Sequence, residues 1–268
     1  MKTSASFFPQ NVCLLGIPYD RKSSFLQGPA LAPPRIREIL TNGAGNDFTE
    51  HTQSPLTDPR WSDLGDFPPT DYFDIEKIIA DILARPCRTL TLGGDHSITF
   101  PVVKACAAAF GTFSILHIDA HGDLYDSLDG DPYSHACPFA RIMENGLARR
   151  LVQVGVRTFT PHQREQAARF GVETIEMTDF ENGKRPHFDG PVYISLDLDG
   201  LDPAFAPGVS HHEPGGLTTR EVLRLIQSLD VPVIGADIVE LNPHRDVHGM
   251  TAAVAAKFLK EIAAKMLG

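Results

Sequence analysis

The stretch that decides the fold is Phe113-Ser-Ile-Leu-His-Ile-Asp-Ala-His-Gly-Asp123, an apolar run that leads directly into acids and imidazoles. A short, continuous apolar run is typical of a strand that is buried on both faces of a parallel sheet. Similar runs recur along the chain and alternate with amphipathic stretches, which is the pattern of βα units. The sequence therefore predicts a single α/β domain over residues 1–268, doubly wound, with three α/β/α layers and a mostly parallel central sheet.

The strands and helices of this domain are expected to alternate. We predict strands at Val12–Ile17, Arg88–Leu92, Phe113–Ile118, Leu151–Val156, Val172–Glu176, Val192–Asp197 and Val233–Asp237. We predict helices at Pro33–Leu40, Asp74–Ala84, Ile98–Phe110, Ala136–Gly146, Pro161–Phe170, Thr219–Leu229 and Thr251–Leu267. The segment Asn42–Pro69 is rich in Gly, Pro, Asn, Asp and Thr, and is expected to form a long surface excursion between the first helix and the next βα unit.

The composition excludes several classes of function. The chain carries 24 Lys and Arg against 34 Asp and Glu, which gives a formal net charge of −10. Affinity for nucleic acid comes from cationic side chains that displace counterions, so an acidic chain without a Lys/Arg run is not expected to bind nucleic acid. No stretch approaches the roughly 20 apolar residues that cross a bilayer, so no membrane partner is expected.

The expected location is the cytoplasm. Residues Met1–Gln10 contain no long apolar region before a small-residue cleavage site, so they do not resemble a secretory signal. The cysteines are far apart and form no Cys-x-x-Cys pair, which argues against a zinc knuckle or a thioredoxin-type site. We expect buried free thiols at Cys13, Cys87, Cys106 and Cys137.

Acids and imidazoles directly follow three of the predicted strands. Gly93-Gly-Asp-His-Ser97 follows one strand, Asp119-Ala-His-Gly-Asp123 follows the second, and the third runs into Asp197-Leu-Asp199. In an extended backbone successive side chains alternate, so groups spaced by two project to one side. Ligand sites in such sheets lie at the carboxyl ends of the strands. The three motifs therefore predict one convergent cluster.

This cluster predicts a site for two metal ions. Its expected ligands are His96, Asp119, His121, Asp123, Asp197 and Asp199. Carboxylates this close cannot all stay ionised without a compensating positive charge, because each raises the pKa of the others. Six mixed Asp and His ligands are too many for one tetrahedral zinc ion and too rich in imidazole for a typical calcium or magnesium site. They suit two ions about 3.5–4 Å apart that share bridging carboxylates, and oxygen and nitrogen ligands without sulfur favour Mn²⁺, with cobalt or iron as substitutes.

Simpler interpretations apply to single residues in these motifs. A lone His or Asp at a strand end is usually a solvated loop residue, but three such motifs, each directly after a strand, are much harder to obtain by accident. His117 lies inside its strand, where a hydrogen-bonded core histidine is a better interpretation than a seventh ligand. Asp95 and Asp126 are interpreted as turn residues or as residues that support the ligands.

The three motifs resemble the signatures of the ureohydrolase family, which includes arginases, agmatinases, guanidinobutyrases, proclavaminate amidinohydrolases and formiminoglutamases. The resemblance runs from Val12 to Lys265 and implies the arginase-like form of the α/β/α fold. The plant-type arginase branch is most similar, in the segments Ser23-Ser-Phe-Leu-Gln-Gly-Pro-Ala30, Tyr133-Ser-His-Ala136, Phe139-Ala-Arg-Ile-Met143, Ala206-Pro-Gly-Val-Ser-His211, Glu213-Pro-Gly-Gly216 and Val239-Glu-Leu-Asn-Pro243.

The resemblance implies a role for each matching residue. It places one manganese ion on His96, Asp119, Asp123 and Asp197, and the other on Asp119, His121, Asp197 and Asp199, so that Asp119 and Asp197 bridge. His135 falls where arginases have a proton-shuttling histidine, and Glu240 matches the carboxylate that binds the guanidinium group. Asp237 fits a supporting role, and assembly into homo-oligomers, either trimers or hexamers, is also implied.

The expected reaction is hydrolysis of a small cationic guanidino compound to urea and an amine. A guanidinium carbon resists attack by water, and a hydroxide held between two metal ions supplies the nucleophile. Asp123 or His135 can relay a proton to the departing amine. Glu240 would orient the planar cation by charge-assisted hydrogen bonds.

Substrate identity depends on the loops that bind the far end of the molecule. Tyr125 stands where animal-type arginases have an Asn that helps to bind the amino-acid carboxylate, a departure shared by agmatinases and plant-type arginases. The loop from Tyr125 to Ser134, which includes Asp126, is acidic and favours a substrate with a cationic tail. Tyr125 and Asp126 are therefore expected to contact the substrate, while His211 and His212 are expected to have a structural role or to lie at the rim of the site.

Arginase is the first expectation, with agmatinase second and guanidinobutyrase also open. Formiminoglutamase, which releases formamide, fits less well because the acidic loop argues against a dicarboxylate substrate. A non-catalytic metal-binding homologue is the alternative from another class. Against it, all six ligand positions and Glu240 hold chemically competent side chains.

Overall fold

The structure is a computed structural model that describes residues 8–43 and 45–268. One eight-stranded sheet runs through the structure in the order β2-β1-β3-β8-β7-β4-β5-β6, and all neighbouring strands are parallel. The strands are β1 (Asn11–Gly16), β2 (Trp61–Asp66), β3 (Cys87–Leu92), β4 (Phe113–Ile118), β5 (Ala148–Val154), β6 (Glu173–Ile175), β7 (Val192–Asp197) and β8 (Val233–Val239). The prediction of an α/β fold with a mostly parallel sheet is confirmed.

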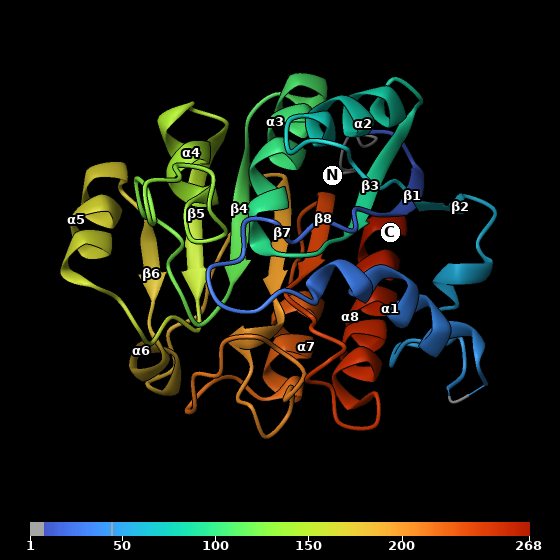
Figure 1. Cartoon of the computed structure of the whole chain (residues 1–268). Coiled ribbons are helices and arrows are strands. Elements are labelled where there is room, and N and C mark those ends of the chain that lie inside the picture. The colour runs from blue at the N-terminus through green and yellow to red at the C-terminus, as the bar shows by residue number, and fades with distance from the viewer. Residues whose placement is uncertain (1–7, 44) are drawn as a thin grey trace.

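Helices cover both faces of this sheet. The α-helices are α1 (Ala32–Thr41), α2 (Asp74–Leu83), α3 (Thr99–Phe110), α4 (Pro138–Glu144), α5 (Pro161–Phe170), α6 (Met177–Glu181), α7 (Thr219–Gln227) and α8 (Met250–Leu267). Figure 1 shows α2, α3 and α4 towards the top of the view and α1, α6 and α7 towards the bottom. Helices α2 to α5 pack on one face, and α1, α6, α7 and α8 pack on the other.

Each face of the sheet has its own apolar core. In β4, Ile115 belongs to the core under α2 to α5, and Leu116 belongs to the core under α1, α7 and α8. Both side chains are fully buried, because successive residues of a strand point to opposite faces and both faces are covered. This double burial explains why the strands appear in the sequence as continuous apolar runs.

Helix α7, which begins at Thr219, starts with a capping box. The side chain of Thr218 accepts the backbone N–H of Glu221 at 3.2 Å, and the Glu221 carboxylate accepts the N–H of Thr218 at 2.8 Å. Thr160 and Gln163 form the same reciprocal pair at the start of α5. Both helix starts are therefore fixed by local hydrogen bonds.

Two elements depart from the predicted alternation. The edge strand β2 lies inside the segment Asn42–Pro69, where Trp61 pairs with Val12 of β1. Its residues are exposed or half-buried, so its sequence lacks the apolar run by which the other strands were found. The short helix α6 follows β6 directly and was also missed. The remaining predicted elements are present, with ends displaced by a few residues.

Two expectations from composition concern the whole described chain. Cys13, Cys87, Cys106 and Cys137 are all buried and free, as expected. Within residues 8–43 and 45–268, no helix combines the length and the apolar character needed to cross a bilayer.

The four central strands bring the predicted site together. Strands β3, β8, β7 and β4 are neighbours in the sheet. His96 follows β3, Glu240 follows β8, Asp197 ends β7, and Asp119 follows β4. Because parallel strands end at the same edge of the sheet, these four side chains meet in one place.

Candidate metal centre

His96 lies at the centre of the candidate site. Its side chain is fully buried, and Nδ1 lies 3.1 Å from Asp119, 3.1 Å from Asp123 and 3.0 Å from Asp197. Each of these distances ends on a carboxylate oxygen. Four of the predicted ligands therefore surround one point.

His121 and Asp199 form a second group beside the first. Nδ1 of His121 lies 3.3 Å from Oδ1 of Asp119 and 3.2 Å from Oδ2 of Asp199. Asp119 thus presents one carboxylate oxygen to His96 and the other to His121. Asp197 accepts the backbone N–H of Asp199 at 2.8 Å. The structure brings all six predicted ligands together, with Asp119 between the two imidazoles.

The chemistry of this cluster fits bound cations. Nδ1 of His96 is buried and has no hydrogen-bond partner among the described residues, although three carboxylate oxygens lie near it. Burial, together with the charges of Asp199 and Asp119, raises the pKa of Asp197 well above its ordinary value. Burial also raises the pKa of Asp199 to about 6. Burial opposes a charge on His96, but the three nearby carboxylates raise its pKa well above the ordinary value. Divalent ions would keep the acids ionised and would take the place of the proton on Nδ1.

A chain of hydrogen bonds orients His96 through Nε2, the ring nitrogen that does not face the carboxylates. The buried carboxylate of Asp237 accepts the hydroxyl of Ser195 at 2.7 Å, and Nε2 of His96 lies 3.0 Å from the same hydroxyl oxygen. Because the Ser195 proton goes to Asp237, the serine oxygen accepts the Nε2–H of His96. Nδ1 then carries the lone pair that a metal ion needs. The supporting role expected of Asp237 is therefore exerted through Ser195, for which no role was predicted.

His117 makes hydrogen bonds on both sides of its ring. Its Nε2 lies 2.7 Å from Asp119, and its Nδ1 lies 3.0 Å from the amide nitrogen of Gln153. An amide nitrogen only donates, so Nδ1 of His117 accepts a hydrogen bond from Gln153. Nε2 therefore carries the ring proton and donates a hydrogen bond to Asp119. Burial lowers the pKa of His117, which favours this neutral ring. The side chain is placed as a hydrogen-bonded core histidine that supports a ligand.

Glu240 and His135 form a buried pair beside the ligands. Glu240 has a φ of +66°, a left-handed conformation that costs a non-glycine residue roughly 1–3 kcal/mol and is typical of functional sites. Its Oε1 accepts the backbone N–H of His96 at 2.9 Å and lies 3.1 Å from Nδ1 of His135. Burial opposes ionisation of both groups, but their hydrogen bond and mutual attraction raise the pKa of His135 to about 9 and lower the pKa of Glu240. At neutral pH the pair is an imidazolium and a carboxylate.

A cavity of about 210 Å³, the active-site cavity, opens onto these groups. Asp123, His135 and Glu240 line it, and Tyr125 lies on its wall, where a substrate contact was expected. Asp126 is not among the residues of this wall, because its mostly exposed carboxylate turns to His162, 3.2 Å away. The structure therefore separates Tyr125 from Asp126.

His211 also faces the active-site cavity. Its Nε2 is buried and lacks a hydrogen-bond partner among the described residues, and its ring lies 5.4 Å from the ring of His135. His212, by contrast, is exposed and lies 2.7 Å from the carbonyl of Pro207. His211 therefore lies at the rim of the site, and His212 does not.

The segment that follows β5 contributes to the site, although no role was predicted for it. Arg157 donates to the backbone carbonyls of Asp199 and Glu213, at 2.8 Å each, and so fixes the loop that carries a ligand. Thr158 and Thr160 line the active-site cavity. Their position in the sequence could have identified them, because they directly follow a predicted strand and must lie at the same edge of the sheet as the ligands.

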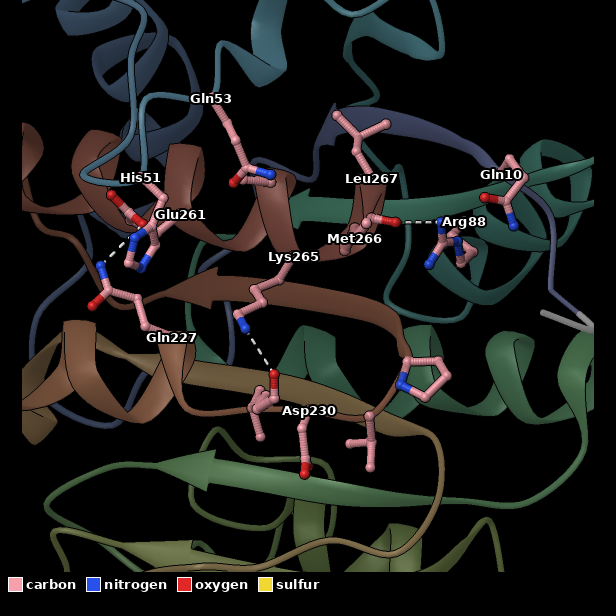
Figure 2. Close-up of a pocket in the computed structure, with 15 residues that line it drawn as sticks. Gln10, His51, Gln53, Arg88, Gln227, Asp230, Glu261, Lys265, Met266 and Leu267 are labelled. Carbon is pink, nitrogen blue, oxygen red and sulfur yellow. Dashed lines mark hydrogen bonds between the residues drawn. The ribbon is translucent and has the colours of Figure 1, made fainter. Parts of the chain in front are cut away.

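A larger cavity, of about 810 Å³, lies at the opposite end of the sheet (Figure 2). Gln10 and Arg88, at the amino ends of β1 and β3, line it together with Lys265 in the last turn of α8. Arg88 donates to the carbonyls of Val233 and Met266, and the second bond satisfies the end of α8. Within the described residues, the candidate metal clusters lie at the other end of the strands, so the smaller cavity is the functional candidate.

Comparisons with known proteins identify similar chains. "Arginase 1, mitochondrial" of Arabidopsis thaliana is 51% identical over 275 residues, which cover 94% of this chain and 80% of the relative. A solved structure described as "Arginase from Medicago truncatula" matches with a TM-score of 0.88 and 44% identity, and covers 97% of this chain and 89% of that one. "Agmatinase" of Bacillus anthracis is more distant, at 31% identity over 98% of this chain and 94% of the relative.

These relatives overturn the expectation of a cytoplasmic location. The Arabidopsis protein is named mitochondrial, as are other similar plant arginases. The argument from Met1–Gln10 tested only for a secretory signal, and such a test does not distinguish the cytoplasm from an organelle.

The match to a family extends over nearly the whole chain. Residues 10–264 match the family described as "Arginase family". That range includes the six predicted ligands together with His135 and Glu240. The chain belongs to the arginase family of hydrolases, whose arginases and agmatinases act on amidino C–N bonds.

Proposed function

We propose that this protein is a manganese-dependent amidinohydrolase that converts L-arginine to L-ornithine and urea. The observation that carries the proposal is the convergence of six metal-ligating side chains with Glu240 and His135 at one cavity. The choice of arginine is supported by the Arabidopsis arginase, which at 51% identity is more similar to this chain than the agmatinase at 31%.

Two Mn²⁺ ions are the proposed cofactors. One would be held by His96, Asp119, Asp123 and Asp197, and the other by Asp119, His121, Asp197 and Asp199. Oxygen and nitrogen donors without sulfur suit manganese, with cobalt or iron as substitutes. When bound, a pair of divalent ions lowers the pKa of water towards neutrality and so makes a nucleophile available at physiological pH.

Glu240 is proposed to bind the guanidinium group of the substrate. Its hydrogen bonds to other described residues all go to Oε1, so Oε2 is free to accept. The lowered pKa of Glu240 keeps the carboxylate ionised. A planar guanidinium donates strong charge-assisted hydrogen bonds to such a carboxylate, which would fix the reacting carbon beside the ligand cluster.

His135 is proposed to supply the proton that the departing amine needs. With a pKa of about 9 it is protonated at neutral pH, and it lines the active-site cavity. Cleavage of the C–N bond leaves an amine that must gain a proton from a positioned acid. Asp123, on the same cavity wall, is the other group that could relay it.

Agmatine is the second candidate substrate. The described residues that line the active-site cavity include no Lys or Arg, so the α-carboxylate of arginine would have to be held by neutral donors such as Tyr125 and Thr160. Agmatine lacks that carboxylate. The agmatinase at 31% identity supports the same alternative.

A substrate panel tests the proposed function. We expect kcat/KM for arginine to exceed that for agmatine and for guanidinobutyrate by at least about tenfold, because even one additional hydrogen bond to a charged group is worth about 1.5–3 kcal/mol. Urea release is measured for the three compounds side by side with added Mn²⁺. A preference for agmatine would reassign the substrate, and absence of urea from all three would refute the amidinohydrolase. Formamide released from formiminoglutamate would indicate the other branch of the family.

Metal removal is expected to destabilise the fold. An ion present at 100 times its Kd adds about 2.7 kcal/mol to the free energy of unfolding, and about 1 kcal/mol shifts the Tm of a chain this size by roughly 2–4 °C. We therefore expect saturating Mn²⁺ to raise the Tm of chelator-stripped protein by at least about 5 °C. Thermal unfolding followed by fluorescence measures this shift. Mg²⁺ at the same concentration is the control, and an equal shift with both ions would contradict a manganese-type donor set.

Assembly into a homo-oligomer, trimer or hexamer, is also proposed. It is supported by the family resemblance.

A further inference from the structure

The loop that follows β1 contacts His135 directly. The hydroxyl oxygen of Ser24 lies 2.8 Å from Nε2 of His135, and the backbone N–H of His135 donates to the carbonyl of Lys22 at 3.2 Å. Lys22 is fixed at both ends, because its N–H donates to Asp95 at 2.9 Å and its ammonium group pairs with Asp131 at 2.6 Å. These contacts hold Ser24 against the imidazole ring.

His135 is therefore hydrogen-bonded at both ring nitrogens. Nδ1 lies 3.1 Å from Glu240, and Nε2 lies 2.8 Å from Ser24. In an imidazolium both nitrogens donate, so Glu240 accepts one proton and the Ser24 oxygen accepts the other. Loss of the Nδ1 proton would leave the buried Glu240 carboxylate facing a lone pair, which is costly. Nε2 is therefore the nitrogen that can release a proton, and it does so beside Ser24, which lines the active-site cavity.

Ser24 lies between two cavities. It lines the active-site cavity and a second cavity of about 150 Å³, the outer cavity, whose walls include Lys22 and Asp131. Among the described residues, Leu128 is the other one that lines both cavities, and its side chain is apolar. Ser24 is exposed to solvent, whereas His135 is 8% exposed. The Ser24 hydroxyl thus connects a buried imidazole with water outside the active-site cavity.

A bound substrate makes such a connection necessary. The active-site cavity holds only about 210 Å³, so a guanidino substrate or its products would displace most of the water that could reach Nε2 from inside. The ring of His211, on the wall of the same cavity, lies 5.4 Å from the ring of His135. The hydroxyl of Ser24 remains as the polar contact at Nε2.

We propose that Ser24 is a positioning residue that returns a proton from the water of the outer cavity to His135 after each turnover. This inference rests on the proposed role of His135 as proton donor. Once Nε2 has given its proton to the amine, the Ser24 O–H bond breaks as an N–H bond forms on Nε2. A buffer acid gives a proton to the serine oxygen through the water of the outer cavity, so serine is unchanged. This proton offsets the one that is released when a new water molecule is deprotonated for the next turnover, so the complete turnover consumes no net proton.

Three variants of the full-length, metal-loaded enzyme test this inference. Ser24→Ala removes the hydroxyl, Ser24→Thr keeps it, and Ser23→Ala makes the same deletion one residue away, where the hydroxyl contacts Asp95 at 3.3 Å. We expect Ser24→Ala to lower kcat for arginine about five- to tenfold, a fraction of the 10²–10⁴-fold that complete general-acid catalysis supplies. KM and metal content should stay within twofold, and Ser24→Thr and Ser23→Ala should retain at least half of the wild-type kcat.

Two further readouts separate proton return from a structural effect. Added imidazole buffer is expected to restore most of the kcat of Ser24→Ala and to leave the wild type unchanged. The solvent isotope effect on kcat should increase in Ser24→Ala, because reprotonation of His135 becomes slow. An unchanged kcat in Ser24→Ala would overturn the inference, as would a loss that Ser24→Thr shares and imidazole does not repair. A wild type that releases no urea from any guanidino substrate would instead refute the proposed function itself.

Discussion

Replacing Asp197 with Asn is expected to lower kcat/KM for arginine by roughly 10³-fold or more, together with loss of bound metal, because the nucleophile depends on both ions. Asp197 lies 3.0 Å from Nδ1 of His96 and is proposed to bridge the two ions. The asparagine keeps the shape of the side chain but removes the negative charge that binds a cation. Metal analysis should therefore find one ion or none per chain, where the wild type holds two.

The same variant distinguishes loss of metal from loss of fold. The asparagine amide can donate to the unpartnered Nδ1 of His96, and one buried carboxylate with a strongly raised pKa is gone. The metal-free variant should then unfold at a Tm no lower than the metal-free wild type, and Mn²⁺ should shift that Tm less. Asp81→Asn, the same change on the exposed face of α2, is the control. Full metal content and activity in Asp197→Asn would show that the assignment of the ligands is wrong.

A ligand of one ion should behave differently from a bridging ligand. His121 contacts Asp119 and Asp199 but belongs only to the second proposed ion position. His121→Asn is therefore expected to retain metal at the position around His96 while losing it at the other. Equal metal loss in His121→Asn and Asp197→Asn would contradict the proposed division of the ligands between two ions.

The strands were predictable where burial on both faces forces a continuous apolar run. β4 and β7 were predicted with the bounds that the structure has, Phe113–Ile118 and Val192–Asp197. The edge strand β2 could not be found in this way, because one of its sides has no neighbouring strand and its residues remain partly exposed. The apolar pattern of a strand reflects its burial, so a strand that is only partly buried does not show the pattern.

The ligand cluster was predictable because each of its motifs directly follows a strand, and parallel strands end at the same edge of a sheet. The spacing by two was a weaker guide, because β4 ends at Ile118 and Asp123 has a φ of +48°, so residues 119–123 do not form an extended segment. The contacts of Ser24 with His135 and of Arg157 with Asp199 join residues far apart in sequence. No repeat or spacing encodes such pairs, so only the folded chain reveals them.

Replacing Glu240 with Gln is expected to lower kcat/KM for arginine by about 10²–10⁴-fold, because a charge-assisted hydrogen bond is worth about 1.5–3 kcal/mol and two are weakened. One is the proposed bond to the guanidinium group, and the other is the observed contact with His135. The glutamine oxygen can still accept the N–H of His96, which keeps the neighbouring ligand in place. Metal content should therefore remain at two ions per chain, in contrast to Asp197→Asn.

The backbone at Glu240 makes this substitution a clean test of charge. Glutamine has the same side-chain length as glutamate. It also has the same conformational strain at a φ of +66°, so the substitution does not change the free energy that this backbone conformation costs. Glu213→Gln, in the loop held by Arg157 but outside the cavity wall, is the matched control and should keep activity within about twofold, as surface changes usually have small effects. A kcat/KM for Glu240→Gln within threefold of wild type would exclude Glu240 as the guanidinium ligand. Loss of metal in this variant would instead indicate that Glu240 acts by holding His96 in place. The hydrogen bond from the His96 backbone to Glu240 is the contact through which it could do so.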